Sequence, residues 1–204
     1  MFGKKRNKQI LLLIIVISLV FVLLFIFTRP VTIVKSVQVP IVNIEPTPLI
    51  VKQTSFGLPT NLVIPNINVD SIIEYVGLTP EGAMDVPKDQ ANVAWLQTGT
   101  RPGETGTAVI DGHYGWKDKK QSAFDNLYKL RPGDKILVKD ETGVDIYFVV
   151  RELKRYSYGA NAKKVFISDD NKSHLNLITC EGTWDQNLKG FSTRLVIFAD
   201  KLEE

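Results

Sequence analysis

The sequence predicts an all-β domain, a barrel or a sandwich of short strands, preceded by a single N-terminal transmembrane helix. Three observations lead to this prediction. A long apolar run comes first, a proline-rich stretch follows it, and from about Phe56 onwards short segments rich in Val, Ile, Tyr and Phe alternate with turn motifs. Helical periodicity is weak in this last part, so only one or two short helices are expected there.

The apolar run extends from Ile10 to Phe27 and is interrupted only by Ser18. At 1.5 Å per residue, about 18 residues span about 27 Å, close to the hydrocarbon thickness of a bilayer. The run is longer than a typical signal-peptide core of about 7–15 residues, and no small-x-small cleavage site follows it. We interpret residues 10–28 as an uncleaved anchor, with a long signal peptide or a buried helix as the alternatives.

A cluster of cations precedes the apolar run: Lys4, Lys5, Arg6 and Lys8. The positive-inside rule places residues 1–9 in the cytoplasm and everything after the anchor outside the membrane. The predicted location is therefore the cell membrane, with a single pass and an extracytoplasmic domain. Much of the net charge of +3 lies in this cluster, so no basic face for nucleic acid is expected.

Residues 29–55 are predicted to be an extended linker that lifts a domain at residues 56–204 off the membrane. The linker contains Pro30, Pro40, Pro46 and Pro48, and prolines at this density forbid a continuous helix.

Within the domain, a short helix is expected over Ser122–Leu127, with Ser122 as its N-cap, and a helical turn over Asp89–Trp95. The remaining β-rich segments are expected to be strands. They are Leu62–Ile67, Ser71–Val76, Thr107–Asp111, Lys135–Val138, Asp145–Glu152, His174–Thr179 and Thr193–Ala199.

Cys180 is the only cysteine, which excludes an internal disulfide and a cysteine-rich zinc site. A lone thiol outside the membrane is a liability unless it reacts. Cys180 follows the predicted strand His174–Thr179 and precedes Glu181-Gly182, so the strand would hold the thiol in place and a loop would expose it. A buried core cysteine is the alternative interpretation.

A nucleophilic thiol needs a base, and the chain has two histidines, His113 and His174. His174 lies six residues before Cys180 in one strand, which is about 20 Å away, so we interpret it as a solvated strand-entry residue. His113 follows the strand Thr107–Asp111 and lies between glycines. Neighbouring strand ends would bring His113 to Cys180; otherwise His113 is a surface turn residue.

Acyl transfer also needs a group that stabilises the oxyanion. Arg194 is the one cation in the apolar strand Thr193–Ala199. A loop over 181–192 would make this strand a neighbour of the strand that carries Cys180. Arg194 then points at the site, or alternatively it faces solvent.

Taken together, these motifs resemble the sortase family. Leu177-Ile178-Thr179-Cys180 resembles its cysteine signature, Gly112-His113 its histidine motif, and Arg194 its arginine. The resemblance covers about Asn61 to Ala199. It implies a closed β-barrel of about eight strands with one or two short helices.

Within the family, Gly77–Pro87 and Cys180-Glu181-Gly182 are most similar to class F members. Two positions depart from the family pattern. Asn176 stands where many members have Thr, and Asp111 stands where many have Ala.

The resemblance implies a cysteine transpeptidase that anchors surface proteins to the cell wall of Gram-positive bacteria. Cys180 would attack the Thr carbonyl of an LPxTG-like sorting signal, His113 would protonate the departing Gly amine, and Arg194 would stabilise the oxyanion. Thr179 would contact the substrate. An amine on a peptidoglycan precursor or a pilin would accept the acyl group, with specificity in the loops 155–173 and 181–192. No cofactor or metal is implied.

Two other kinds of protein would be compatible with parts of the pattern. One is another thiol hydrolase or an L,D-transpeptidase-like enzyme, although that family places Ser-His-Gly-Cys close together, whereas His113 and Cys180 are far apart here. The other is a non-enzymatic cell-surface β-domain that binds a wall component.

Overall fold

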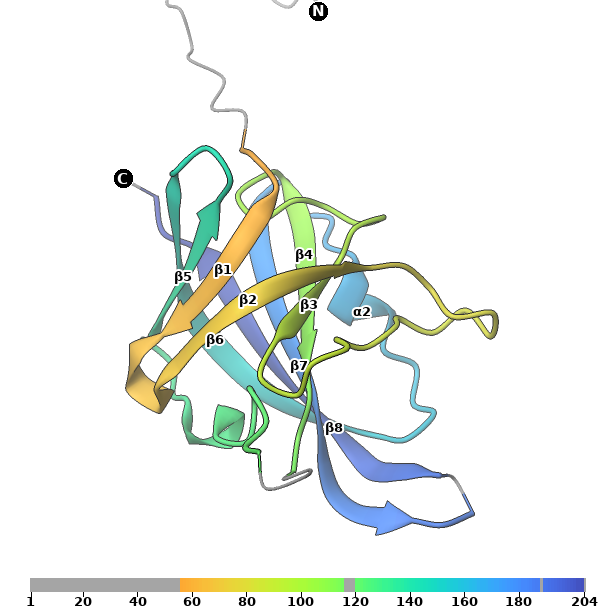
Figure 1. Ribbon diagram of the computed structural model, residues 1–204. Helices are drawn as coiled ribbons and strands as arrows, with labels where there is room; N and C mark the ends of the chain where they lie inside the picture. The colour runs from red at the N-terminus through yellow and green to blue at the C-terminus, as the bar shows by residue number, and fades with distance from the viewer. Residues whose placement is uncertain (1–55, 116–119, 188, 204) are drawn as a thin grey trace, which may run out of the picture. The chain divides into compact units, whose positions relative to one another are not determined.

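Eight strands close into a barrel in the order β1-β2-β3-β4-β7-β8-β6-β5 (Figure 1). Closure leaves no long unpaired edge. This arrangement confirms the predicted all-β barrel of about eight strands. The strands are β1 Pro59–Ile64, β2 Val69–Val76, β3 Val93–Leu96, β4 Gly106–Gly112, β5 Lys135–Asp140, β6 Asp145–Ser157, β7 Ser173–Asp185 and β8 Gly190–Lys201.

The computed structural model describes residues 56–115, 120–187 and 189–203. The cytoplasmic terminus, the anchor and the linker predicted for residues 1–9, 10–28 and 29–55 lie outside these ranges. Among the helices that are described, none has the length and apolar character needed to cross a bilayer.

Among the described residues, the helical elements are short and differ from the predicted ones. They are the 3₁₀ turns η1 Pro65–Ile67 and η2 Leu127–Lys129, and the helix α2 Lys163–Phe166. The helix predicted over Ser122–Leu127 is wrong, because this segment forms turns that lead into η2. Its expected N-cap is also wrong: the backbone N–H of Ser122 donates to Oδ2 of Asp125 at 3.3 Å, so the aspartate caps the turn.

The prediction of a helical turn over Asp89–Trp95 is also wrong in its second half, because Val93–Trp95 belong to strand β3. All four residues of Val93–Leu96 are buried, so the strand shows no alternation of apolar and polar positions. In a short run of apolar residues, the periodicity of a helix cannot be distinguished from that of a strand. Pairing with β2 and β4 defines Val93–Leu96 as a strand.

The barrel interior is filled by the inward-facing residues of the strands. On β7, Leu175 and Leu177 point into this core, so that Ile178 and Cys180 occupy the alternate positions. At the end of β4, Gly112 faces the core, and a Cβ there would lie 2.5 Å from the ring of Phe124. Glycine therefore allows the end of β4 to pack directly on that ring, next to His113.

A second apolar cluster lies outside the barrel. Val165 of α2 packs with Val196 and Phe198 of β8, and Ile178 of β7 lies against them. The short helix thus covers part of the outer surface of β7 and β8, on the side where the candidate site lies.

The segment 181–192 was predicted to be a loop, but most of it is the extended tip of the β7–β8 hairpin. Trp184 pairs with Phe191 and Asp185 pairs with Gly190, after a register shift that begins at Glu181. Figure 1 shows this hairpin projecting beyond the rest of the barrel. Cys180 was predicted to follow the end of a strand. It lies instead within β7, next to the register shift at Glu181.

Candidate active site

The register of three neighbouring strands brings the predicted site residues together. β4 and β7 are parallel and pair Asp111 with Ile178, and the same offset two residues further places His113 opposite Cys180. β7 and β8 are antiparallel and pair Cys180 directly with Arg194. Because adjacent strands lie about 4.8 Å apart, the three residues form one row across the outer surface of the barrel.

The row borders a cavity of about 270 Å³ between the barrel and two covering segments. The β2–β3 connection and the α2 region supply most of its apolar lining, and β7 and β8 supply the floor. The lining side chains are Ala83, Met84, Val86, Ala160, Ala162, Val165, Phe166, Ile178 and Val196, together with the ionisable Asp111, His113, Tyr156, Cys180 and Arg194. An apolar cavity with a few convergent polar groups is typical of a ligand-binding site.

The thiol of Cys180 is half-buried in this cavity. Burial raises its pKa above the usual value, and the carboxyl group of Asp111 acts in the same direction, whereas the positive charge of Arg194 lowers the pKa. Burial prevails, so the resting side chain is a thiol. A base must take its proton when it attacks.

His113 is oriented by a backbone carbonyl. Its Nε2 lies 2.8 Å from the carbonyl oxygen of Pro87, and since a carbonyl only accepts, Nε2 carries the proton. The lone pair is then on Nδ1. Within the described residues no hydrogen bond joins His113 to Cys180, a common situation in sites without substrate.

The segment that holds His113 is itself anchored. The carboxylate of Glu74 accepts the backbone N–H of Lys88 at 2.9 Å and that of Asp89 at 3.2 Å. Although burial raises the pKa of Glu74, these hydrogen bonds and one from Asn92 lower it overall. An ionised Glu74 on β2 therefore fixes the chain next to Pro87.

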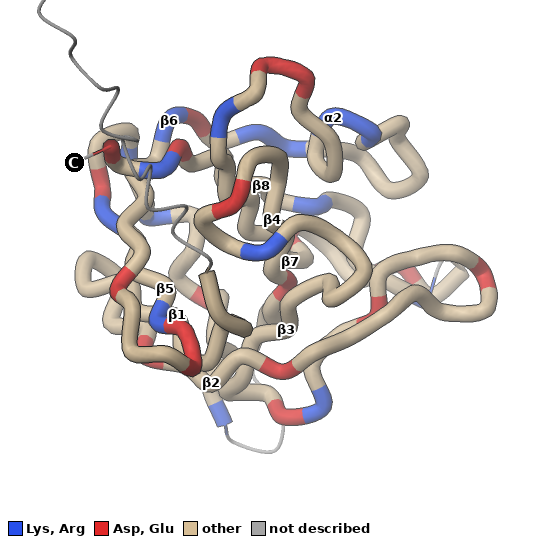
Figure 2. Tube along the Cα trace, turned by 90° about the horizontal axis from the view of Figure 1, so that it is seen from above, with Lys and Arg blue, Asp and Glu red and all other residues tan. Residues whose placement is uncertain are grey.

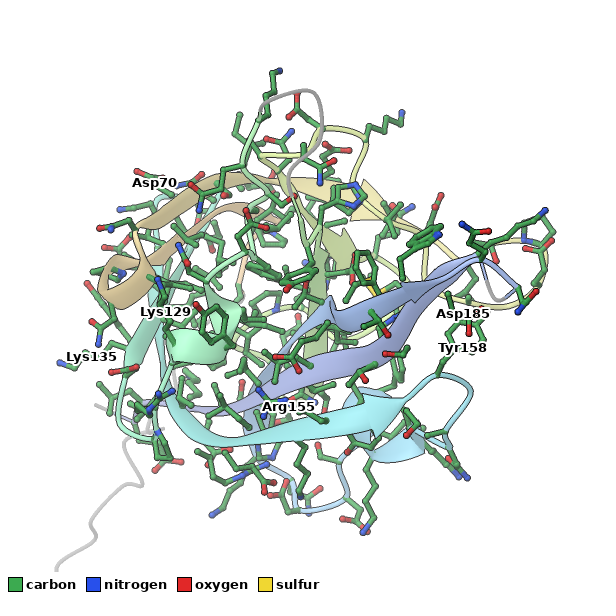
Figure 3. The ribbon with its side chains drawn as sticks, turned by 90° about the horizontal axis from the view of Figure 1, so that it is seen from below. Asp70, Lys129, Lys135, Arg155, Tyr158 and Asp185 are labelled. Atoms are coloured by element: carbon green, nitrogen blue, oxygen red, sulfur yellow. The ribbon has the colours of Figure 1, made fainter. Side chains whose placement is uncertain are left out.

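Arg194 is held by its own strand and by an aromatic ring. Its Nη1 donates to the carbonyls of Phe191 at 3.1 Å and Thr193 at 3.2 Å, and the guanidinium lies 5.6 Å from the ring centroid of Tyr158. The backbone N–H of Tyr158 donates to Ser192 at 2.9 Å. Figure 3 shows Tyr158 on the loop after β6, near the hairpin that carries Asp185. Arg194 retains free N–H groups that can bind an oxyanion.

The structure does not place Thr179 on the cavity wall, although a substrate contact was predicted for it. Its side chain is 1% exposed, and Oγ1 donates to the carbonyl of Gly112 at 2.7 Å. Strand alternation explains the difference, because Thr179 must face inward when Cys180 faces outward. Thr179 instead links β7 to β4 between Cys180 and His113.

Replacing Thr179 with valine, which keeps the shape, is expected to destabilise the fold by about 1–3 kcal/mol, because the buried carbonyl of Gly112 loses its donor. Urea unfolding would measure this loss. Thr179→Ser keeps the hydroxyl and serves as the matched control. If the valine variant is as stable as the serine variant, this hydrogen bond does not support the site.

His174 is not the solvated residue that its polar surroundings predicted. It is 5% exposed, with Nδ1 at 2.7 Å from Asp200 and Nε2 at 2.9 Å from Asp170. The hydrogen bond from His174 lowers the pKa of Asp170. Pairing of His174 with Asp200 across β7 and β8 creates this buried contact, which the local sequence does not reveal.

Asp111 is the cavity residue that sequence reasoning missed, although its departure from the family pattern was visible. Burial raises the pKa of Asp111 from 3.8 to about 8, against the positive charge of Arg194 and a hydrogen bond from the backbone of Gly112, which lower it. Burial therefore favours the protonated form of the Asp111 carboxyl group.

This raised pKa predicts a pH-dependent stability. Because the folded state favours the protonated carboxyl, its contribution is complete below the unfolded value of 3.8 and is lost as the pH rises through about 8. The wild type should therefore lose stability relative to Asp111→Asn between acidic and alkaline pH. Urea unfolding of both proteins at about pH 5 and about pH 9 measures this; a constant difference contradicts the assignment.

Among the described residues, no group of three or more His, Cys, Asp or Glu side chains could hold a metal ion. Figure 2 marks the Lys and Arg positions and the Asp and Glu positions along the Cα trace, and positions of both signs occur among the described residues.

The chain matches the family model of the sortase domain over residues 62–202, well over half of its length. The chain therefore belongs to the sortase family, as its motifs predicted.

Solved sortase structures are similar to this one. Sortase C-1 from Actinomyces oris has a TM-score of 0.57 at 22% identity, over 71% of this chain and 74% of that one. The lid mutant of Streptococcus agalactiae sortase C1 has 0.54 at 24%, over 71% and 69%. Sortase A from Corynebacterium diphtheriae has 0.57 at 22%, over 75% and 64%. These likenesses establish the fold. No curated protein matched the chain.

Proposed function

We propose that this chain is a membrane-anchored sortase that cleaves an LPxTG-like sorting signal between Thr and Gly and transfers the acyl group to an amine. The observation that carries the proposal is the row of His113, Cys180 and Arg194 beside an apolar cavity, in a chain of the sortase family. The apolar lining would hold the Leu and Pro side chains of the signal.

In the first half of the reaction, the thiol proton of Cys180 passes to Nδ1 of His113 and the thiolate attacks the Thr carbonyl carbon. A C–S bond forms and the carbonyl electrons move to oxygen. The charge of Arg194 and a backbone N–H stabilise this oxyanion. When the oxyanion collapses, the C–N bond breaks, the imidazolium gives its proton to the leaving Gly amine, and a thioester remains on Cys180.

In the second half, an incoming amine attacks the thioester and loses a proton to His113. The C–S bond breaks, an amide bond forms, and the imidazolium of His113 returns the proton to the departing thiolate, which regenerates the thiol of Cys180. The acceptor would be an amine on a peptidoglycan precursor or on a pilin. The positive cluster at residues 1–9 and the apolar run at 10–28 support a single-pass anchor with the barrel outside the cell membrane.

We also propose that the chain is a class F member. The segments Gly77–Pro87 and Cys180-Glu181-Gly182 support this assignment. The similar structures named above are sortases of classes A and C, so the subclass stays a prediction.

To test the function, the full-length chain in detergent micelles would be incubated with a quenched fluorescent Leu-Pro-Ala-Thr-Gly peptide, with and without an amine. Intact mass would detect the acyl-enzyme, with Cys180→Ala as the control. A thioacyl adduct that requires Cys180, and an amide product that requires the amine, are the expected results.

Other outcomes would favour a different protein class. Hydrolysis that ignores the amine would indicate another thiol hydrolase. If no peptide reacts and Cys180 resists alkylation, a non-enzymatic binding domain would replace the proposal.

A further inference from the structure

Asp111 introduces a carboxyl group into a cavity whose other peptide-facing walls are largely apolar. Of the cavity-lining side chains in the described part of the chain, Asp111 is the only carboxylic acid. It is half-buried, and the outward side of β4 directs it towards the cavity, while Ile110 and Gly112 face the core. The mechanism above does not use this group.

The carboxyl group of Asp111 is available to a ligand. Within the described ranges no side chain donates to it, and no ion pair joins it to Arg194; the backbone N–H of Gly112 lowers its pKa. A polar group that is partly removed from water and lacks partners loses free energy, which a hydrogen-bonding ligand would restore.

The position of Asp111 places it beside the substrate and away from the reacting bond. Asp111 pairs with Ile178, and Ile178 pairs with Val196, so these residues form a row two positions from that of Cys180. At about 3.3 Å per residue the two rows lie about 7 Å apart. A peptide whose carbonyl meets Cys180 would therefore bring a neighbouring side chain to Asp111.

The charged groups of the cavity determine which kind of substrate side chain could bind next to Asp111. The ionisable groups facing Asp111 are His113 of the β4 end, Cys180 of β7, Arg194 of β8 and Tyr156 of β6. Arg194 disfavours a second cation in the cavity, and a substrate carboxylate would compete with the oxyanion for Arg194. A neutral group that both donates and accepts avoids both costs.

We infer that Asp111 is a specificity-determining residue, which selects a sorting peptide carrying a primary amide side chain, Asn or Gln, at one of the three positions before its Thr. A protonated carboxyl group has an O–H donor and an acceptor oxygen, and a primary amide has N–H donors and an acceptor oxygen, so the two groups can form two hydrogen bonds side by side. The inference rests on the proposed function, since it concerns the peptide that this cavity would hold.

The expected preference follows from two neutral hydrogen bonds in a partly buried site. Each contributes about 0.5–1.5 kcal/mol, so an amide should be favoured over alanine by about 10- to 100-fold in kcat/KM. The preference should fall as the pH rises through about 8, because the ionised carboxylate loses its donor.

The test uses the full-length chain in detergent micelles and quenched peptides in which Asn, Gln, Ala, Leu, Glu or Lys occupies in turn each of the three positions before Thr. Wild type should cleave an Asn or Gln peptide about 10- to 100-fold faster than the matching Ala peptide. Asp111→Ala should lose this preference while it cleaves the Ala peptide. Asp111→Asn, which keeps a donor and an acceptor, should retain the preference and make it independent of pH.

Cleavage without an amide preference at any position, or a preference that survives in Asp111→Ala, overturns the inference and leaves the proposed function intact. Peptide binding to Cys180→Ala, measured by calorimetry, separates the two ideas. Amide-selective binding without cleavage by the wild type would support the inference and contradict the transpeptidase. If neither cleavage nor amide-selective binding occurs, both are wrong.

Discussion

Replacing His113 with alanine is expected to lower kcat/KM for peptide cleavage by about 10²–10⁴, the range of a general acid–base group. The pKa of Cys180 is raised by burial, so the thiol needs a nearby base before it can attack. The Gly amine also needs a proton as it leaves. The register of β4 and β7, continued by two residues, places His113 opposite Cys180, and Nε2 of His113 donates to the carbonyl of Pro87, so Nδ1 carries the lone pair. A quenched fluorescent peptide measures the rate.

His174→Asn provides the matched control for this prediction. His174 contacts Asp170 and Asp200 and lies away from the Cys180 cavity, so its loss should lower stability and leave the rate of the folded enzyme nearly unchanged. If His113→Ala retains near-wild-type activity, or if His174→Asn loses as much as His113→Ala, the base has been assigned to the wrong residue.

Replacing Arg194 with alanine is expected to lower kcat by about 10²–10³, the scale of losing one oxyanion donor. Arg194 pairs directly with Cys180 across β7 and β8, and its charge lowers the pKa of that thiol. Two effects should therefore appear together in Arg194→Ala. Peptide cleavage should slow, and alkylation of Cys180 by iodoacetamide should require a higher pH.

Two further variants distinguish charge from geometry. Arg194→Lys keeps a cation but loses the planar donor pair, so it should recover only part of the rate. Arg151→Ala removes a cation of β6 that pairs with Asp200 outside the cavity, and it should cleave peptide normally. Full activity in both Arg194 variants would show that another group stabilises the oxyanion.

The sequence allowed most of the barrel to be predicted, because a strand with one buried face shows its period locally. β5 is an example: the buried Ile136 and Val138 alternate with Lys135, Leu137 and Lys139, which are exposed or partly exposed. The prediction failed at Val93–Leu96, where every residue is buried and no alternation exists. It also failed at 181–192, where hairpin pairing extends the strands through a segment whose composition suggests a loop.

The site could also be predicted in part, because some of its features are local in the sequence. Residue type and strand-end position indicated Cys180, His113 and Arg194, and the resemblance to sortases joined them into one mechanism. The side-chain environment of Thr179 and His174 was predicted wrongly. Thr179 faces the carbonyl of Gly112, 67 residues away in the chain, and His174 faces Asp200 across the sheet.

The sequence by itself determined that this chain carries a β-rich domain with a single cysteine, because apolar periodicity and residue type are local properties. Only the tertiary structure decided which side chains share the cavity. The parallel register of β4 and β7 places Asp111 two residues from the row of Cys180, and burial there raises its pKa to about 8. Register and burial arise from contacts between distant segments, so no local pattern encodes them.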